Sequence, residues 1–513
     1  MAVKVAATVR RMWGLAGAAV LLCVCVGSGR AAAATISKGA WSFPSNPQLQ
    51  PPALVVSQRS QAGRAQRPGG GLIFIAPIRA YARKLPFAGL PGPEIVEPDG
   101  QPVWQLPLRN RNPKTGQVEV AMDLFRATYQ GQPVLVWWQG YITPEGFGEG
   151  QWVFVNQRYE PILHVRAPAG MATDFHALHI FPNGNLLLLA TKVVGADLKP
   201  FGGPPHGRLL DDLVLEVEPK SGRVLWSWNP YGHVPLSASY QPIPKNGRPW
   251  DAFHLNSLDI GPGGNLIVSA RNTWAAYWVM RRTGRVFAVL GGKHPTFKEL
   301  PGAHFAWQHD VHYVAGHGQL ISVFDDEAAP PEAKQSRAIL LSLNWKQHTV
   351  SLYRQYLLPK PALAGSQGSV QVLSDGNVFV GWGQLPYLSE YSAAGKLLYL
   401  ATFPGSDESY RAFRGTWNGQ PATAPTVVQL PAPGRVRVGV SWNGATEVAA
   451  WQLLGGESPS TLVPLTGPVV RRGFETVLGT PKKVAYVEVR ALAKDGRQLA
   501  VTPLLKTSQS SSP

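Results

Sequence analysis

The feature that most constrains this chain is the repeated pairing of a Gly-centred turn with a short apolar run. One series reads PNGNLLLL (182–189), GGNLIVS (263–269), GHGQLISV (316–323) and DGNVFV (375–380). A second series, GRVLW (222–226), GRVF (284–287) and GKLLY (395–399), is interleaved with the first. Turn residues that accept positive φ, followed by apolar runs of this length, predict β-hairpins with buried strands. The chain is therefore expected to be all-β.

The spacing of these hairpins indicates how the strands are organised. Sheet-sized units that recur every ~50–80 residues are typical of a β-propeller, whose closure removes exposed sheet edges. Residues 71–420 have room for five or six four-stranded blades. Two stacked β-sandwiches are the alternative that spacing alone leaves open. Because 513 residues exceed one ordinary core, a second domain is expected as well.

The regions that flank residues 71–420 differ from it in composition and in the pattern of apolar residues. Residues 421–506 alternate apolar and polar positions in short segments, which predicts an immunoglobulin-like or fibronectin-like β-sandwich. Residues 35–70 are rich in Pro, Gln, Ser and Gly and are expected to form an extended lead-in that wraps the next domain. The Ser-rich residues 507–513 are expected to be a disordered tail.

The first 34 residues have the parts of a secretory signal peptide. Lys4, Arg10 and Arg11 precede an apolar run over 12–26, and a small-residue stretch, AAAA (31–34), follows. This predicts a secreted or periplasmic protein with no membrane span after cleavage, and an uncleaved anchor is the alternative. Both cysteines, Cys23 and Cys25, lie in this segment, so the mature chain is expected to have neither a disulfide nor a thiolate nucleophile.

The charge of the chain favours anionic partners. The formal net charge is +17, and about four of the positive charges belong to the first 34 residues. Nucleic acid is disfavoured, because neither a basic helix nor an aromatic RNA-binding motif is present. Small anionic substrates or an acidic cell envelope fit the composition better.

The histidines point to the propeller as the place of any imidazole chemistry. All 12 histidines lie between His164 and His348. Three clusters, DFHALH (174–179), FHLNS (253–257) and WQHD (307–310), each come just before a Gly-centred hairpin. Comparable positions of successive blades converge on the central channel, so His176, His254 and His309 are expected to meet there, with Arg271 pointing to the same place.

A group of three histidines and one arginine at the central channel has three interpretations. Neutral imidazoles could bind a metal, or Arg and His donors could hold an anion while one imidazole acts as a nucleophile. The third interpretation is that these histidines are structural. A guanidinium beside a dication is unfavourable, whereas it suits sulfate or phosphate oxygens, so the anion site is favoured. The histidines expected to be structural or exposed are His179, His294, His304, His312 and His317.

Taken together, the motifs resemble those of the arylsulfotransferase family, especially its actinobacterial and fungal branch. The resemblance is carried by DFH (174–176), HLNS (254–257), SAR (269–271), WQHD (307–310), FDD (324–326), SQG (366–368), GWG (381–383), SYRAF (409–413) and SWNGAT (441–446), with WW (137–138) upstream. These motifs cover nearly all of the mature chain. The resemblance implies a six-bladed propeller and a transfer of sulfuryl groups from phenolic sulfate esters to phenols that is independent of the nucleotide donor PAPS.

The resemblance also implies roles for individual residues. His309 would be the nucleophile and would form a sulfohistidine, with Asp310 or a backbone carbonyl setting its tautomer. The residues implied to line the sulfuryl pocket or to bind substrate are His176, His254, Asn256, Arg271, Gln308 and Gln367. The spacing, rather than the resemblance, bears on Asp325, Asp326 and Glu327, which are expected to be solvated or to stabilise a turn, with a catalytic role as the alternative. No metal or other cofactor is expected. The rival functions are a non-catalytic propeller that binds anionic envelope ligands and a His-ligated, metal-dependent hydrolase.

Overall fold

The computed structural model describes residues 39–59, 71–79, 87–405 and 407–508, so the expected signal segment lies outside the described residues. The described chain is built of β-strands, and no α-helix occurs in these ranges. Four short 3₁₀ turns connect strands: η1 (Lys199–Phe201), η2 (Leu236–Ala238), η3 (Pro262–Gly264) and η4 (Arg271–Thr273). The expected all-β class is confirmed.

Six sheets of four or five strands, antiparallel except for one short parallel pair, account for most of the chain. The first joins β2 (Leu72–Arg79), β3 (Glu94–Val96) and β4 (Pro102–Gln105) to β26 (Asp407–Gly415). The next two are β5 (Val120–Tyr129), β6 (Gln132–Ile142), β7 (Gly148–Val155) and β8 (Pro161–Val165), then β9 (Ala172–Ile180), β10 (Leu186–Ala196), β11 (Gly207–Glu218) and β12 (Arg223–Trp228).

The other three sheets follow in chain order. The fourth is β13 (Leu255–Ile260), β14 (Leu266–Ala270), β15 (Ala275–Val279) and β16 (Val286–Gly291). The fifth is β17 (Lys298–Glu299), β18 (His309–Val314), β19 (His317–Asp325), β20 (Arg337–Asn344) and β21 (Thr349–Tyr356), in which β17 pairs in parallel with β21. The sixth is β22 (Ser369–Val372), β23 (Val378–Gly381), β24 (Tyr387–Tyr391) and β25 (Leu397–Thr402), with β1 (Val55–Arg59) at its edge.

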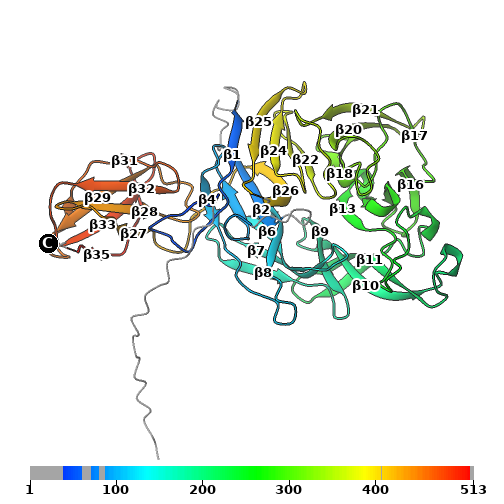
Figure 1. Cartoon of the computed structure of the whole chain (residues 1–513), viewed down its shortest axis with the longest axis horizontal. Helices are drawn as coiled ribbons and strands as arrows, with labels where there is room; N and C mark the ends of the chain where they lie inside the picture. The colour runs from blue at the N-terminus through cyan, green and yellow to red at the C-terminus, as the bar shows by residue number, and fades with distance from the viewer. Residues whose placement is uncertain (1–38, 60–70, 80–86, 406, 509–513) are drawn as a thin grey trace, which may run out of the picture. The chain divides into compact units, whose positions relative to one another are not determined.

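One edge strand from each of the six sheets takes part in a closed ring of contacts. Contacts run from β5 to β9, β13, β18, β22 and β26 in turn, and β26 contacts β5 again. The ring closes because β26, late in the chain, pairs with β2, which lies near its beginning. In Figure 1 the blue β2 accordingly lies beside the yellow β26. This propeller-like arrangement brings residues from six distant segments to one axis.

The unbroken apolar runs of the sequence follow from this architecture. Along β10, Leu187 and Leu189 pack in a cluster shared with β13, β14 and β15, whereas Leu186 and Leu188 pack in one shared with β6 and β7. Successive side chains of a strand point to opposite faces of the sheet. Both faces of this sheet are buried, so both sets of positions are apolar.

The last part of the described chain holds two more sheets around one separate core. One sheet comprises β27 (Thr426–Gln429), β28 (Val436–Ser441) and β32 (Glu475–Thr480). The other comprises β29 (Ala450–Gly456), β30 (Val463–Pro464), β31 (Val469–Val470), β33 (Tyr486–Leu492), β34 (Gln498–Val501) and β35 (Leu505–Lys506). Val438 of the first sheet and Val489 of the second are fully buried in this core.

The expected lead-in and tail are tied to these sheets. Ser45 hydrogen bonds to Ser441 of β28, and the same lead-in supplies β1 to the sixth sheet. The first two residues of the expected tail are hydrogen bonded: the Thr507 hydroxyl donates to the Val484 carbonyl, and the Ser508 amide donates to Gln429. The other residues of the expected tail, 509–513, lie outside the described residues. Within the described ranges, no helix has the length and apolarity to cross a membrane.

Candidate functional site

The candidate site forms where the innermost strands lose their regular register. The pairing shifts in β13 between Leu255 and Ser257, and in β18 between His309 and His312. Residues at or next to such irregularities have positive φ values, 57° for His254 and 56° for Asp310. A bulge bends a strand and turns side chains in a new direction. These irregularities therefore direct polar side chains toward the axis. In a regular strand, successive side chains would instead alternate between the two faces of the sheet.

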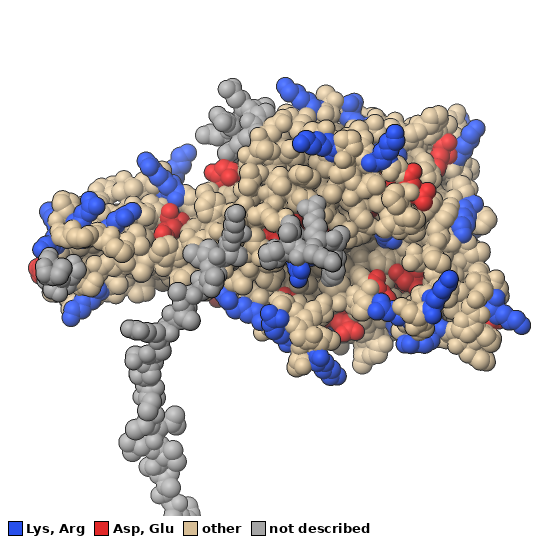
Figure 2. Space-filling view, viewed as in Figure 1, with Lys and Arg blue, Asp and Glu red and all other residues tan. Residues whose placement is uncertain are grey.

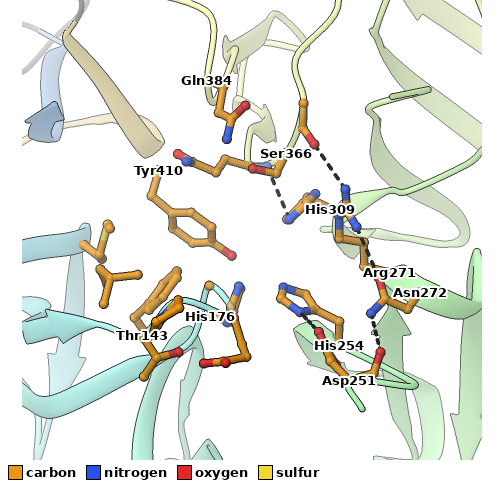
Figure 3. A pocket seen from close by; sticks show the side chains of 18 of the residues that line it. Thr143, His176, Asp251, His254, Arg271, Asn272, His309, Ser366, Gln384 and Tyr410 are labelled. Carbon is orange, nitrogen blue, oxygen red and sulfur yellow. Dashed lines mark hydrogen bonds and ion pairs between the residues drawn. The ribbon is translucent and has the colours of Figure 1, made fainter. Parts of the chain in front are cut away.

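A cavity of about 390 Å³ opens at this point, and its lining includes five of the seven residues implied by the sequence (Figure 3). Those five are His176 of β9, His254 just before β13, Arg271 of η4, His309 of β18 and Gln367 just before β22. Further lining residues that the sequence did not single out for a role in binding include Met122, Ile142, Thr143, Glu145, Phe175, Gln241, Asp251, Asn272, Ser366, Gln384 and Tyr410.

The three cavity histidines share one arrangement: each has its Nδ1 next to a carboxylate. The pairs and their separations are His176–Asp174 at 2.6 Å, His254–Asp251 at 2.6 Å and His309–Asp326 at 2.8 Å. A neutral imidazole that donates from Nδ1 keeps its lone pair on Nε2. The carboxylates therefore orient all three rings with Nε2 as the acceptor.

His309 has the environment of a neutral nucleophile. Its side chain is 1% exposed, and its Nε2 accepts a hydrogen bond of 3.2 Å from the backbone amide of Gln367. Because Nε2 accepts, the ring proton resides on Nδ1, which donates to Asp326. Burial, with the positive charge of Arg271 nearby, lowers the pKa of His309 well below its ordinary value of 6.5. His309 is therefore uncharged at neutral pH.

Asp326, and not Asp310, is the carboxylate that sets the tautomer of His309. Asp310 follows His309 directly in the chain, but its carboxylate accepts from the Val370 amide and pairs with Arg411 and His312. The reason is the bulge, which turns neighbouring side chains apart. The expected turn-stabilising role fits Asp325, which accepts from the Ala306 amide, whereas it does not fit Asp326.

Arg271 is placed to bind an anion in the cavity. Its guanidinium lies 4.7 Å from the ring centre of Trp307, donates to the Gly365 carbonyl at 3.1 Å and approaches Asn272 Oδ1 at 3.2 Å. These contacts use one N–H group on each terminal nitrogen, and the Nε is without a hydrogen-bond partner among the described residues. A guanidinium has five N–H groups, so donors remain for an oxyanion.

Asn256 and Gln308 lie behind the cavity wall, which differs from their expected role in contacting substrate. The Asn256 amide donates to the Gln308 carbonyl at 2.6 Å. The Gln308 side chain donates to the Ser269 hydroxyl and to the carbonyls of Ala270 and Ala275. Both side chains are fully buried. They brace the segment between Trp307 and His309, because their hydrogen bonds join Gln308, just before β18, to β13, β14 and β15.

Tyr410 and Phe175 form an aromatic wall that the sequence signalled only through the SYRAF and DFH motifs. The two rings meet edge-on with centroids 4.9 Å apart, and Tyr410 lies 5.5 Å from the His176 ring and 6.4 Å from the His309 ring. Burial raises the pKa of Tyr410 well above its ordinary value, so it remains a neutral phenol. This wall offers stacking surface for an aryl group.

The histidines expected to be structural or exposed lie away from the cavity lining. His294 and His317 are exposed, His304 hydrogen bonds to Glu299, and His179 is half-buried. His312 lies in an ion pair with Asp310. No three His, Cys, Asp or Glu side chains converge as metal ligands within the part of the chain that the structure describes.

Solved structures with a similar chain path are distant from this protein. A protein of unknown function from Bacteroides caccae is 13% identical over 67% of this chain and 98% of its own, with a TM-score of 0.40. A protein from Lactobacillus plantarum is 11% identical over 80% of this chain and 99% of its own, with a TM-score of 0.34. A virginiamycin B lyase from Staphylococcus aureus is 7% identical over 76% and 97%, with a TM-score of 0.33.

Sequence comparison is more informative than these structural similarities. No curated protein matches the chain. The family model described as Arylsulfotransferase (ASST) matches residues 126–403, more than half of the chain and the part that holds His176, His254, Arg271 and His309. The chain belongs to the arylsulfotransferase family.

Proposed function

We propose that this protein transfers a sulfuryl group from an aryl sulfate to a phenolic acceptor through a sulfohistidine at His309, in a ping-pong reaction independent of PAPS. The observation that carries the proposal is the neutral, buried His309, with its Nδ1 on Asp326 and its Nε2 at a cavity that also holds Arg271. Membership of the arylsulfotransferase family supports the reaction class.

In the first half-reaction the sulfuryl oxygens face Arg271 and the aryl group lies against the wall of Tyr410 and Phe175. The Nε2 of His309 attacks sulfur, a nitrogen–sulfur bond forms, and the sulfur–oxygen bond to the aryl group breaks to release a phenolate. The Gln367 amide, already 3.2 Å from Nε2, is near enough to donate to a sulfuryl oxygen. Fixed donors of this kind stabilise the charge that spreads over the oxygens.

In the second half-reaction a phenol takes the sulfuryl group from His309. Its hydroxyl proton passes to the Nε2 of His254, whose ring is held by Asp251 through Nδ1. The phenol oxygen bonds to sulfur, and the nitrogen–sulfur bond returns its electron pair to His309. The protonated His254 then protonates the phenolate that leaves in the next cycle, which balances the protons.

We also propose that the six sheets are six propeller blades, which span residues 71–420, and that the two later sheets form the immunoglobulin-like sandwich of residues 421–506. The closed contacts from β5 to β26 support the propeller.

We further propose export of the protein and cleavage near residue 34. N-terminal sequencing of protein recovered from the producing cell's exterior or periplasm tests the cleavage.

The first test compares native protein, His309→Ala and His304→Ala with 4-nitrophenyl sulfate, with and without phenol. Native protein and the His304→Ala control should release nitrophenol in a phenol-dependent manner, and His309→Ala should not. Without acceptor, mass spectrometry should find one sulfuryl group on the peptide that contains His309 in native protein.

Other outcomes contradict parts of the proposal. Full activity of His309→Ala would eliminate the nucleophile assignment. Release that is independent of phenol would mean hydrolysis, and stoichiometric zinc, iron or manganese in active protein would favour a metal-dependent hydrolase. Binding of aryl sulfates without turnover would leave an anion-binding propeller.

A further inference from the structure

We propose that Arg411 is a positioning residue for the transfer, because one buried guanidinium joins the strands that carry His309, His254 and Tyr410. The proposal rests on the proposed function, and it concerns how the reacting groups are held rather than which group reacts. It gives a role to the SYRAF motif of the sequence.

The Arg411 side chain makes three polar contacts with three other sheets. Its Nη1 donates to Asp123 of β5 at 3.1 Å, its Nη2 donates to the Asn256 carbonyl of β13 at 2.8 Å, and its Nε lies 3.1 Å from Asp310 of β18. The side chain is 4% exposed. Four of the six sheets therefore meet at one guanidinium, which itself belongs to β26.

Each of these contacts is next to a residue that faces the cavity. Asp310 follows His309, Asn256 is two residues beyond His254, and Tyr410 precedes Arg411. The innermost strands belong to different sheets, so no backbone ladder joins them. Side chains that cross the axis must set the distances between them. A displacement of ~1 Å at reacting groups can cost a factor of about 10² in rate.

Carboxylates of the protein itself offset the positive charge of Arg411. Asp123 and Asp310 face the guanidinium directly, and His312 links Asp310 to Asp259. Burial raises the pKa of Asp123 to about 6, and the charge of Arg411 opposes that shift. The three contacts need the forked geometry of a guanidinium, which the single nitrogen of a Lys cannot reproduce.

A second arginine on the same strand provides a matched control. Arg414 is three residues beyond Arg411 and is 6% exposed. The polar contacts of its side chain among the described residues are an ion pair with Glu390 and a hydrogen bond to the Gly71 carbonyl. It therefore matches Arg411 in burial and charge pairing, but it does not reach β5, β13 or β18.

The test compares Arg411→Lys with Arg414→Lys in the full chain, using 4-nitrophenyl sulfate with phenol. Arg411→Lys should lower kcat by a factor of about 10² with a small change in the donor KM, because it misplaces His309 while the donor still meets Arg271. Arg414→Lys should keep kcat within about threefold. Equal losses in the two variants, or a loss confined to KM, would overturn the proposal.

Two further measurements keep the result interpretable. If Arg411→Lys fails to fold, Asp123→Asn removes one of the three contacts and should lower kcat in the same direction, and unchanged kcat would contradict the proposal. If even native protein shows no turnover, the proposed function fails, and crystal structures of both Lys variants test the positioning separately. The position of His309 or of the Asn256 carbonyl should shift in Arg411→Lys but not in Arg414→Lys. Unshifted positions in Arg411→Lys would overturn the proposal.

Discussion

At the scale of single residues, the chemistry depends on which nitrogen of His309 carries the proton. The Gln367 amide points to Nε2 and the Asp326 carboxylate to Nδ1, so the lone pair that attacks sulfur is on Nε2. His176 and His254 repeat the arrangement with their own carboxylates. Asp326 and Arg271 also interact electrostatically. Burial raises the pKa of Asp326, and the positive charge of the Arg271 guanidinium opposes that rise.

Replacement of Asp326 by Asn should remove most of the activity while His309 stays in place. An amide N–H at Nδ1 stabilises the tautomer with the proton on Nε2, which lacks the attacking lone pair. The expected loss in kcat is about 10⁴-fold, the loss that tautomer reversal causes in a serine protease. Steady-state kinetics with 4-nitrophenyl sulfate measure it. Asp325→Asn is the control, because Asp325 pairs with Arg337 instead, and an equal loss there would argue against the tautomer explanation.

At the scale of elements, irregular inner strands connect the fold to the site. The register of β13 shifts next to Asn256 and that of β18 shifts at Asp310, and both residues contact Arg411. His312 of β18 is held between carboxylates there: burial alone lowers its pKa, but Asp310 and Asp259 raise it to about 10. The same strand therefore carries an uncharged His309 and a charged His312.

His312 should stabilise the fold in a pH-dependent way. Because its pKa is about 10 in the folded protein and 6.5 as the ordinary value, its stabilisation is complete below pH 6.5 and is lost as pH rises toward 10. The melting temperature of native protein should exceed that of His312→Gln most at pH 6.5 or below, and the difference should shrink by pH 10. Exposed His317→Gln serves as the control. A difference that stays constant with pH would contradict the ion-pair assignment.

At the scale of the whole molecule, net charge complements the anionic donor. The formal charge is +17, and Figure 2 shows Lys and Arg spread over the visible face with fewer Asp and Glu among them. A protein of this charge raises the local concentration of small anions. Arg271 then holds the donor by short-range contacts at the cavity, where salt screens less.

The efficiency of the donor half-reaction should fall with ionic strength. We expect kcat/KM for 4-nitrophenyl sulfate to decrease by up to about tenfold between low and physiological salt, because screening weakens long-range attraction. The kcat/KM for the acceptor, a neutral phenol, should change little and provides the internal control. Equal salt effects on both substrates would indicate a change in the protein rather than weaker attraction of the donor.

Part of this description could be read from the sequence by itself. Gly-centred turns and apolar runs are local signals, so they identified the β-hairpins and the all-β class. Histidines before successive hairpins occupy equivalent places in repeated units, which is why His176, His254 and His309 could be expected at one focus. Arg271 could be expected at the same focus, the family motifs added Gln367, and all five residues line the cavity.

Only the tertiary structure decided which groups meet across the axis. Asp310 is adjacent to His309 in sequence, yet the bulge in β18 turns it to Arg411 and leaves His309 to Asp326, 17 residues away. The contacts of Arg411 with Asp123 and Asn256 span 288 and 155 residues. Local propensities do not encode such pairs, because they depend on ring closure and on bulges whose direction is set by the packing of neighbouring sheets.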